Sequence, residues 1–191
     1  MKLREVKRWG IDIGNVIVKN FSREDRHCIE VLAKDFCSRN PGGAEHELME
    51  ALDEPLRKYA KLVPDAVRGV KKLVTISGPE NVFVVSRAKG LERSVNRRLL
   101  TLFNIPGETG LRLNNVCFVD ERQDKAGVCK DLLIDGHIDD NGEVLHALAG
   151  TVPQIVWFSP TLEDLTKWSP KLPKDVHIVH CWAHFWQKYD D

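Results

Sequence analysis

The sequence has no surplus of either charge and no long apolar run. Its 191 residues contain 28 lysines and arginines against 28 aspartates and glutamates. A general binder of nucleic acid or of anionic membranes normally shows a basic excess, so we expect neither partner. No stretch approaches the ~18 to 20 consecutive apolar residues that a membrane-spanning helix needs. The first ten residues, MKLREVKRWG, lack the apolar core of a secretory signal.

The sequence also lacks paired cysteines. Its five cysteines are an odd number, they are widely separated, and none forms a CxxC pair. They are Cys28, Cys37, Cys117, Cys129 and Cys181. This pattern is typical of reduced thiols, and it predicts a cytoplasmic protein rather than a disulfide framework. With 42% hydrophobic and 29% charged residues, the composition excludes a disordered chain and predicts one domain over residues 1–191.

Short apolar runs alternate with amphipathic segments along most of the chain. The first predicted strand lies in the apolar run 9–18 and stops at the loop marked by Asp12, Gly14 and Asn15. The other predicted strands are 81–86, 116–119, a brief one around 137–138, 155–158 and 176–179. The predicted helices are 65–78, 91–103, 124–133, 143–149 and 182–188. The range from about 20 to 62 is more polar and has room for two or three short helices. This alternation predicts an α/β fold whose parallel sheet is covered on both faces, with a small helical insert after the first strand.

Polar side chains follow the predicted strands, and in an open parallel sheet ligands bind at the carboxyl ends of the strands. The residues at these positions are Asp12 and Gly14, Ser86 and Arg87, Lys125 on the next helix, and the pair Asp139 and Asp140. Carboxylate oxygens suit Mg²⁺, which keeps several waters and takes the rest of its ligands from substrate phosphate. The pattern therefore predicts a site for Mg²⁺ and a phosphate group.

Four segments resemble, in order, the four motifs of the haloacid dehalogenase-like (HAD) hydrolases. They are WGIDIGNVIV, VFVVSRA, DKAGVCKDL and HIDDNGEVL, and the first is similar to the subgroup written DxGNV. Each motif alone is weakly specific, but four in the right order are much stronger. The resemblance covers roughly residues 9–148. It implies a three-layer Rossmann-like fold, a cap-like insert at about 20–62, and a Mg²⁺-dependent phosphohydrolase that acts on a phosphate monoester.

The resemblance implies a role for each residue at the phosphate. Asp12 would attack phosphorus and form an aspartyl-phosphate intermediate. Ser86 would hydrogen-bond a phosphoryl oxygen, and Lys125 would neutralise charge on the phosphoryl group and on Asp12. Arg87 is a further candidate for phosphate binding, with a solvated surface position as its alternative. Lys130 is the rival to Lys125 as the motif lysine, and each could instead be a solvated helix residue.

The resemblance also implies a metal site. Mg²⁺ would be held by Asp12, the backbone carbonyl of Gly14 and Asp139, with Asp140 close by. The alternatives are that Asp12 caps a turn and that Asp139 and Asp140 cap the following helix. Many of the family's phosphatases carry a general-acid aspartate at the position of Gly14, and a glycine has no proton to deliver.

Other functions stay open from the sequence. The chain could be a catalytically weak or inactive HAD-like protein that binds a phosphorylated ligand or a protein partner, and the dehalogenase branch ranks lower. The expected ligand is a small phosphorylated molecule. The short insert suggests an open site or closure by a second subunit, so a homo-oligomer is allowed. The segment HIVHCWAHFW contains His177, His180, Cys181 and His184, which could bind zinc, although residues 177 and 180 of a strand face opposite sides.

Overall fold

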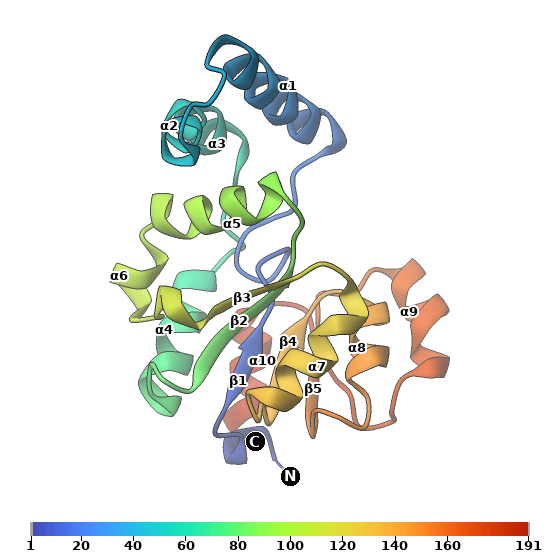
Figure 1. Cartoon of the computed structure of the whole chain (residues 1–191). Coiled ribbons are helices and arrows are strands. Elements are labelled where there is room, and N and C mark those ends of the chain that lie inside the picture. The colour runs from blue at the N-terminus through green and yellow to red at the C-terminus, as the bar shows by residue number, and fades with distance from the viewer. Residues whose placement is uncertain (1, 191) are drawn as a thin grey trace.

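The computed structural model describes residues 2–190, and its centre is a six-stranded parallel sheet (Figure 1). The strand order is β3-β2-β1-β4-β5-β6, so the first strand lies in the middle of the sheet. The strands are β1 (Trp9–Ile11), β2 (Val82–Arg87), β3 (Val116–Val119), β4 (Gly136–Asp139), β5 (Gln154–Phe158) and β6 (His177–Val179). Each pairs in parallel with its neighbour, so all the strands have their carboxyl ends at one edge of the sheet.

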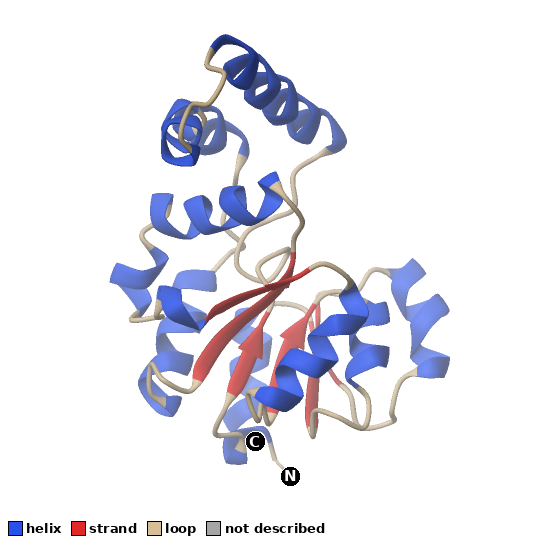
Figure 2. Ribbon diagram, viewed as in Figure 1, coloured by secondary structure: helices blue, strands red, loops and turns tan. Residues whose placement is uncertain are grey.

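Helices cover both faces of the sheet, as Figure 2 shows. Alternate residues of β2 explain this, because Val82 and Val84 belong to one apolar cluster and Phe83 and Val85 to the other. The first cluster includes residues of α4 (Ala66–Ser77), α5 (Leu91–Leu102), α6 (Ile105–Thr109) and α10 (Trp182–Asp190). The second includes residues of α7 (Lys125–Asp131), α8 (Gly142–Leu148) and α9 (Leu162–Trp168). The expected three-layer α/β fold is therefore confirmed.

The helical insert after the first strand consists of α1 (Arg23–Arg39), α2 (Glu45–Ala51) and α3 (Asp53–Tyr59). These helices lie together beyond α5, away from the sheet (Figure 1). The hydroxyl of Ser22 accepts the backbone N–H of Asp25 at 3.0 Å and so caps the start of α1. The guanidinium of Arg98 on α5 donates to both carboxylate oxygens of Asp53 on α3, at 2.6 and 2.5 Å. This bidentate pair ties the insert to the core.

The first strand ends at Ile11, directly before Asp12, so the predicted loop after it is confirmed. After Ile11 the chain turns back, with Asn15 at a φ of 51° and a β-bridge between Gly14 and Val18. The apolar residues of this loop are buried as fully as strand residues. Helices α6 and α9 were not predicted.

The aromatic residues of the C-terminal segment close the core. The indole N–H of Trp182 donates to the carbonyl of Val16 at 2.9 Å, and its ring lies 5.6 Å from that of Phe185. A Cβ on Gly69 of α4 would lie 2.3 Å from the Trp182 ring, so this close packing requires a glycine. None of the helices within residues 2–190 has both the length and the apolar character needed to cross a bilayer.

Candidate active site

A buried lysine joins the carboxyl ends of the two central strands. Lys125 is the first residue of α7, and only 1% of it is exposed. Its Nζ donates to Oδ1 of Asp12 at 2.9 Å and to Oδ2 of Asp139 at 2.7 Å. Burial lowers the pKa of Lys125, but the charges of Asp12 and Asp139 outweigh it and raise the pKa above its ordinary value. Lys125 is thus not a solvated helix lysine, whereas Lys130 on the same helix is exposed.

A buried histidine holds Asp139 from the other side. Oδ2 of Asp139 also lies 3.2 Å from Nε2 of His137, and Oδ1 accepts the backbone N–H of Asn141 at 3.0 Å. Burial raises the pKa of Asp139, but Lys125 and His137 together lower it to about 2. Burial likewise lowers the pKa of His137, but the hydrogen bond to Asp139 raises it to about 9. Both groups are therefore charged at neutral pH, and their hydrogen bond fixes the orientation of both side chains.

The role of His137 was not predicted from the sequence, although its position gave one signal. His137 stands two residues before Asp139 on the same strand, so both side chains project to the same face of the sheet. The neighbouring strand carries Gly10 opposite His137, and a Cβ there would lie 2.3 Å from Nδ1 of the imidazole. The glycine of β1 therefore makes room for the histidine ring beside the site.

Three carboxylates form a cluster that fits a divalent cation. Asp12, Asp139 and Asp140 each offer an oxygen, and these atoms lie within 4.8 Å of one another. Burial, followed by the charges of Asp139 and Asp12, raises the pKa of Asp140 to about 7. Nδ2 of Asn15 donates to Asp140 at 2.7 Å, which holds this carboxylate toward the cluster. Three carboxylates that offer hard oxygen donors this close together are a suitable ligand set for Mg²⁺.

Neither the aspartate pair Asp139 and Asp140 nor Ser86 caps the helix that follows it. The side chain of Asn141, rather than Asp139 or Asp140, accepts the first backbone N–H groups of α8. Helix α5 begins after Gly90 without a side-chain cap, so Ser86 does not cap it.

Ser86 and Arg87 lie at the end of β2 but differ in their surroundings. Ser86 is 3% exposed and lines the same cavity as Asp12 and Lys125, and its hydroxyl makes no hydrogen bond to residues 2–190. It is therefore available to a ligand. The guanidinium of Arg87 lines the cavity too, but it donates to the carboxylate of Glu92 at 2.8 Å.

The space beside Gly14 is occupied by another side chain. A Cβ on Gly14 would lie 2.6 Å from Oδ1 of Asn20 and 3.4 Å from Oδ2 of Asp12. The glycine is needed for this close approach, since the positive φ of the loop is at Asn15 and not at Gly14. An amide thus stands where a side chain of residue 14 would project.

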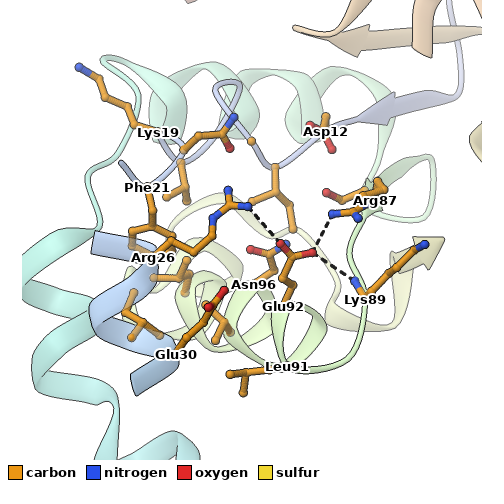
Figure 3. Close-up of a pocket in the computed structure, with 18 of the residues that line it drawn as sticks. Asp12, Lys19, Phe21, Arg26, Glu30, Arg87, Lys89, Leu91, Glu92 and Asn96 are labelled. Atoms are coloured by element: carbon orange, nitrogen blue, oxygen red, sulfur yellow. Dashed lines mark hydrogen bonds and ion pairs between the residues drawn. The ribbon is translucent and has the colours of Figure 1, made fainter. Parts of the chain in front are cut away.

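One cavity connects this site to the insert. It has a volume of about 810 Å³, and its wall includes Asp12, Gly14, Ser86, Lys125, Asp139 and Asp140 together with residues of α1 and α5. Figure 3 shows the carboxylate of Glu92 on the wall of this cavity. It forms ion pairs with Arg26 and Arg87 and accepts the backbone N–H of Lys89. All seven predicted site residues, distant in sequence, therefore line one cavity.

The C-terminal histidines do not form a comparable cluster. Nε2 of His177 lies 2.8 Å from Oε1 of Gln154, while the rings of His180 and His184 pack 5.4 Å apart. Across residues 2–190, the three aspartates are the only group of three or more acidic, His or Cys side chains close enough to hold a metal ion.

Known proteins resemble this chain in structure but not in sequence. No family model matches the sequence, and no curated protein matches it. Solved structures do match over nearly the whole chain. A HAD-like hydrolase from Streptococcus pneumoniae is 11% identical, with a TM-score of 0.57 and 96% and 98% of the two chains covered.

Two further structures are described as phosphatases. D,D-heptose 1,7-bisphosphate phosphatase from B. bronchiseptica, complexed with magnesium and phosphate, is 10% identical, with a TM-score of 0.55 and coverage of 95% and 97%. A predicted phosphoglycolate phosphatase from Haemophilus somnus is 13% identical, with a TM-score of 0.55 and coverage of 95% and 96%. The chain therefore has the fold of the HAD-like hydrolases.

Proposed function

We propose that the protein is a HAD-like phosphohydrolase of the DxGNV subgroup, which uses Mg²⁺ to hydrolyse a phosphate monoester through an aspartyl-phosphate on Asp12. The observation that carries the proposal is the buried Lys125 between Asp12 and Asp139, with Ser86 available on the wall of the same cavity. Two buried carboxylates and the half-buried Asp140 beside them repel one another, and a bound divalent cation would relieve that repulsion. Charge of this kind at strand ends is typical of a catalytic site.

The residues supply the parts that phosphoryl transfer needs. Oδ1 of Asp12 is held by Lys125, so Oδ2 is the oxygen that attacks phosphorus; the new bond is Oδ2–P, and the bond to the leaving oxygen breaks. Lys125 and the hydroxyl of Ser86 bind the phosphoryl oxygens as charge shifts among them. Water then attacks the phosphorus, which releases inorganic phosphate and restores the Asp12 carboxylate.

The metal would be held by Asp12, Asp139 and the carbonyl of Gly14, with Asp140 beside it. When bound, Mg²⁺ supplies positive charge near the phosphoryl oxygens. His137 holds Asp139 as a carboxylate and so keeps this ligand ready.

The leaving group receives little help from the first motif. Gly14 has no proton to give, and the nearby Asn20 carries an amide, which donates hydrogen bonds but not protons. We therefore expect activated esters and acyl phosphates to react faster than alkyl phosphates. The rate should fall steeply as the pKa of the leaving group rises. A flat dependence, with efficient turnover of alkyl phosphates, would show that another group supplies the proton.

The test is a phosphatase screen with Mg²⁺ against a panel of phosphorylated metabolites, with p-nitrophenyl phosphate included and Asp12→Asn as the control. Hydrolysis that the control loses supports the proposal, and Ser86→Ala should lower it by about 10². If neither the native protein nor the control hydrolyses any ester, the chain is better explained as a protein that binds a phosphorylated ligand. A cytoplasmic location and a homo-oligomer stay predictions.

A further inference from the structure

We propose that the leaving group of the substrate has a bulky and mainly apolar body, which the cavity holds between α1 and α5. This inference rests on the proposed phosphohydrolase function and specifies which phosphate monoesters the site takes.

The size of the cavity is the first argument. Its volume of about 810 Å³ lies in the upper part of the ~300 to 1,000 Å³ range of pockets that enclose drug-sized ligands. A phosphoryl group with a leaving group of two or three carbons occupies a small part of that space. The remainder extends from the aspartates toward the insert.

The wall of this remainder is the second argument. Ile29, Ala33 and Cys37 of α1 all line the cavity, and their spacing of four residues places them on one face of the helix. Ile29 and Ala33 are the two buried residues of α1.

The facing helix presents a matching stripe. Leu91, Val95 and Leu99 of α5 also lie four residues apart, and all three line the same cavity. Val95 and Leu99 are already buried. The accessible apolar surface of the cavity therefore comes from the half-buried Leu91, Phe21 and Leu48. An apolar body placed against these side chains would be stabilised, because both surfaces leave water.

The fold itself keeps the two helices apart. The insert is joined to α5 by the bidentate pair of Arg98 with Asp53 and by the hydrogen bond from Ser94 to Glu45. None of these four residues lines the cavity. On the cavity side, Arg26 reaches Glu92 at 3.5 Å, and both side chains are more than a third exposed. An exposed pair of this kind contributes little, so α1 is positioned by contacts outside the cavity.

The charges on the wall exclude one kind of leaving group. Apart from Lys125 and the three aspartates, two carboxylates line the cavity, Glu30 and Glu92, against six basic residues: Lys19, Arg26, Lys34, Arg87, Lys89 and Arg122. This local excess of positive charge disfavours a cationic leaving group, such as that of phosphocholine.

Binding of two phosphonates tests the inference without any need for turnover. Methylphosphonate and 1-naphthylmethylphosphonate share the phosphate-like group, but only the second has an apolar body. With Mg²⁺ present, calorimetry should show that the naphthyl compound binds the native protein roughly tenfold tighter or more.

Two tryptophan variants of α1 form a matched pair. Cys37 is exposed and lines the cavity, while Val31 is 47% exposed on the same helix and does not line it. Cys37→Trp should abolish the preference for the naphthyl compound, and Val31→Trp should retain it. Neither should change the affinity for methylphosphonate. Asn96→Trp, on the α5 wall, should repeat the loss if Cys37→Trp does not fold.

The outcomes separate the inference from the proposed function. Equal affinity for both phosphonates, or a preference that survives both cavity variants, overturns the inference even if Asp12-dependent hydrolysis is found. The other outcome is a preference for the naphthyl compound that the cavity variants remove, with no Asp12-dependent hydrolysis of any ester. That outcome overturns the proposed function and supports the inferred class of ligand.

Discussion

Replacing Lys125 by methionine tests the charge arrangement at the centre of the site. Methionine fills a similar volume but cannot donate to Asp12 or Asp139, so two buried carboxylates lose their shared cation. Removing one partner of a buried ion pair typically costs ~3 to 5 kcal/mol. We therefore expect the free energy of unfolding to fall by ~3 kcal/mol at pH 7.

The pH dependence gives a second, independent readout. In the native protein the pKa of Asp139 is depressed, so its contribution to stability is present above pH 4 and is lost as the pH falls toward 2. In Lys125→Met the same carboxylate keeps His137 but loses the lysine whose charge does most to lower its pKa, so its pKa rises and part of the penalty is relieved when it takes up a proton. The difference in stability between the two proteins should therefore be smaller at pH 5 than at pH 7.

Urea denaturation in EDTA measures both effects, because the chelator prevents a divalent ion from replacing the lost charge. Lys130→Met is the matched control, since Lys130 lies on the same helix but is exposed, and it should change stability by less than ~0.5 kcal/mol. A loss below ~1 kcal/mol for Lys125→Met, or an equal loss at pH 5 and pH 7, would refute the reasoning.

Three further predictions concern the loop after β1 and the metal ligands. Gly14→Asp should destabilise the fold by less than ~1 kcal/mol, because its Cβ meets only the exposed Asn20 side chain, which can rotate away, and adding Asn20→Ala should remove that loss in urea denaturation. His137→Phe retains a ring over β1 but removes the donor to Asp139, so calorimetry should show Mg²⁺ affinity about tenfold weaker; an unchanged affinity would mean that this hydrogen bond does not orient the ligand. Asp139→Ala should weaken Mg²⁺ binding and His180→Ala should not, whereas Zn²⁺ binding that disappears with His180 would place the metal site at the C-terminus.

The order of strands and helices could be predicted because most of them are marked by their own apolar pattern. Val116–Val119 has the predicted bounds, and α5 differs from its prediction by one residue. Helix α6 was missed because its five residues, IPGET, are too few for a helical period and include proline and glycine. Helix α9 was missed because none of its seven residues is buried, so no apolar face marks it.

The site could be predicted in part, since each polar residue follows a strand and the strands are parallel. What could not be predicted depends on tertiary packing. The pairing of His137 with Asp139 requires the space above Gly10. The Asn20 side chain lies beside Gly14 only because the loop after β1 folds back on itself. The cavity wall depends on where the contacts of α2 and α3 hold α1 relative to α5, and no local pattern encodes that distance.

Trapping the phosphorylated residue is the most direct test of the account. The protein is quenched with acid during turnover of p-nitrophenyl phosphate in Mg²⁺, and its peptides are mapped by mass spectrometry. The account predicts one phosphoryl group on the peptide that contains Asp12, released by hydroxylamine as an acyl phosphate should be, and absent from Asp12→Asn. A phosphoryl group on another residue, or hydrolysis that continues undiminished in Asp12→Asn, would contradict it.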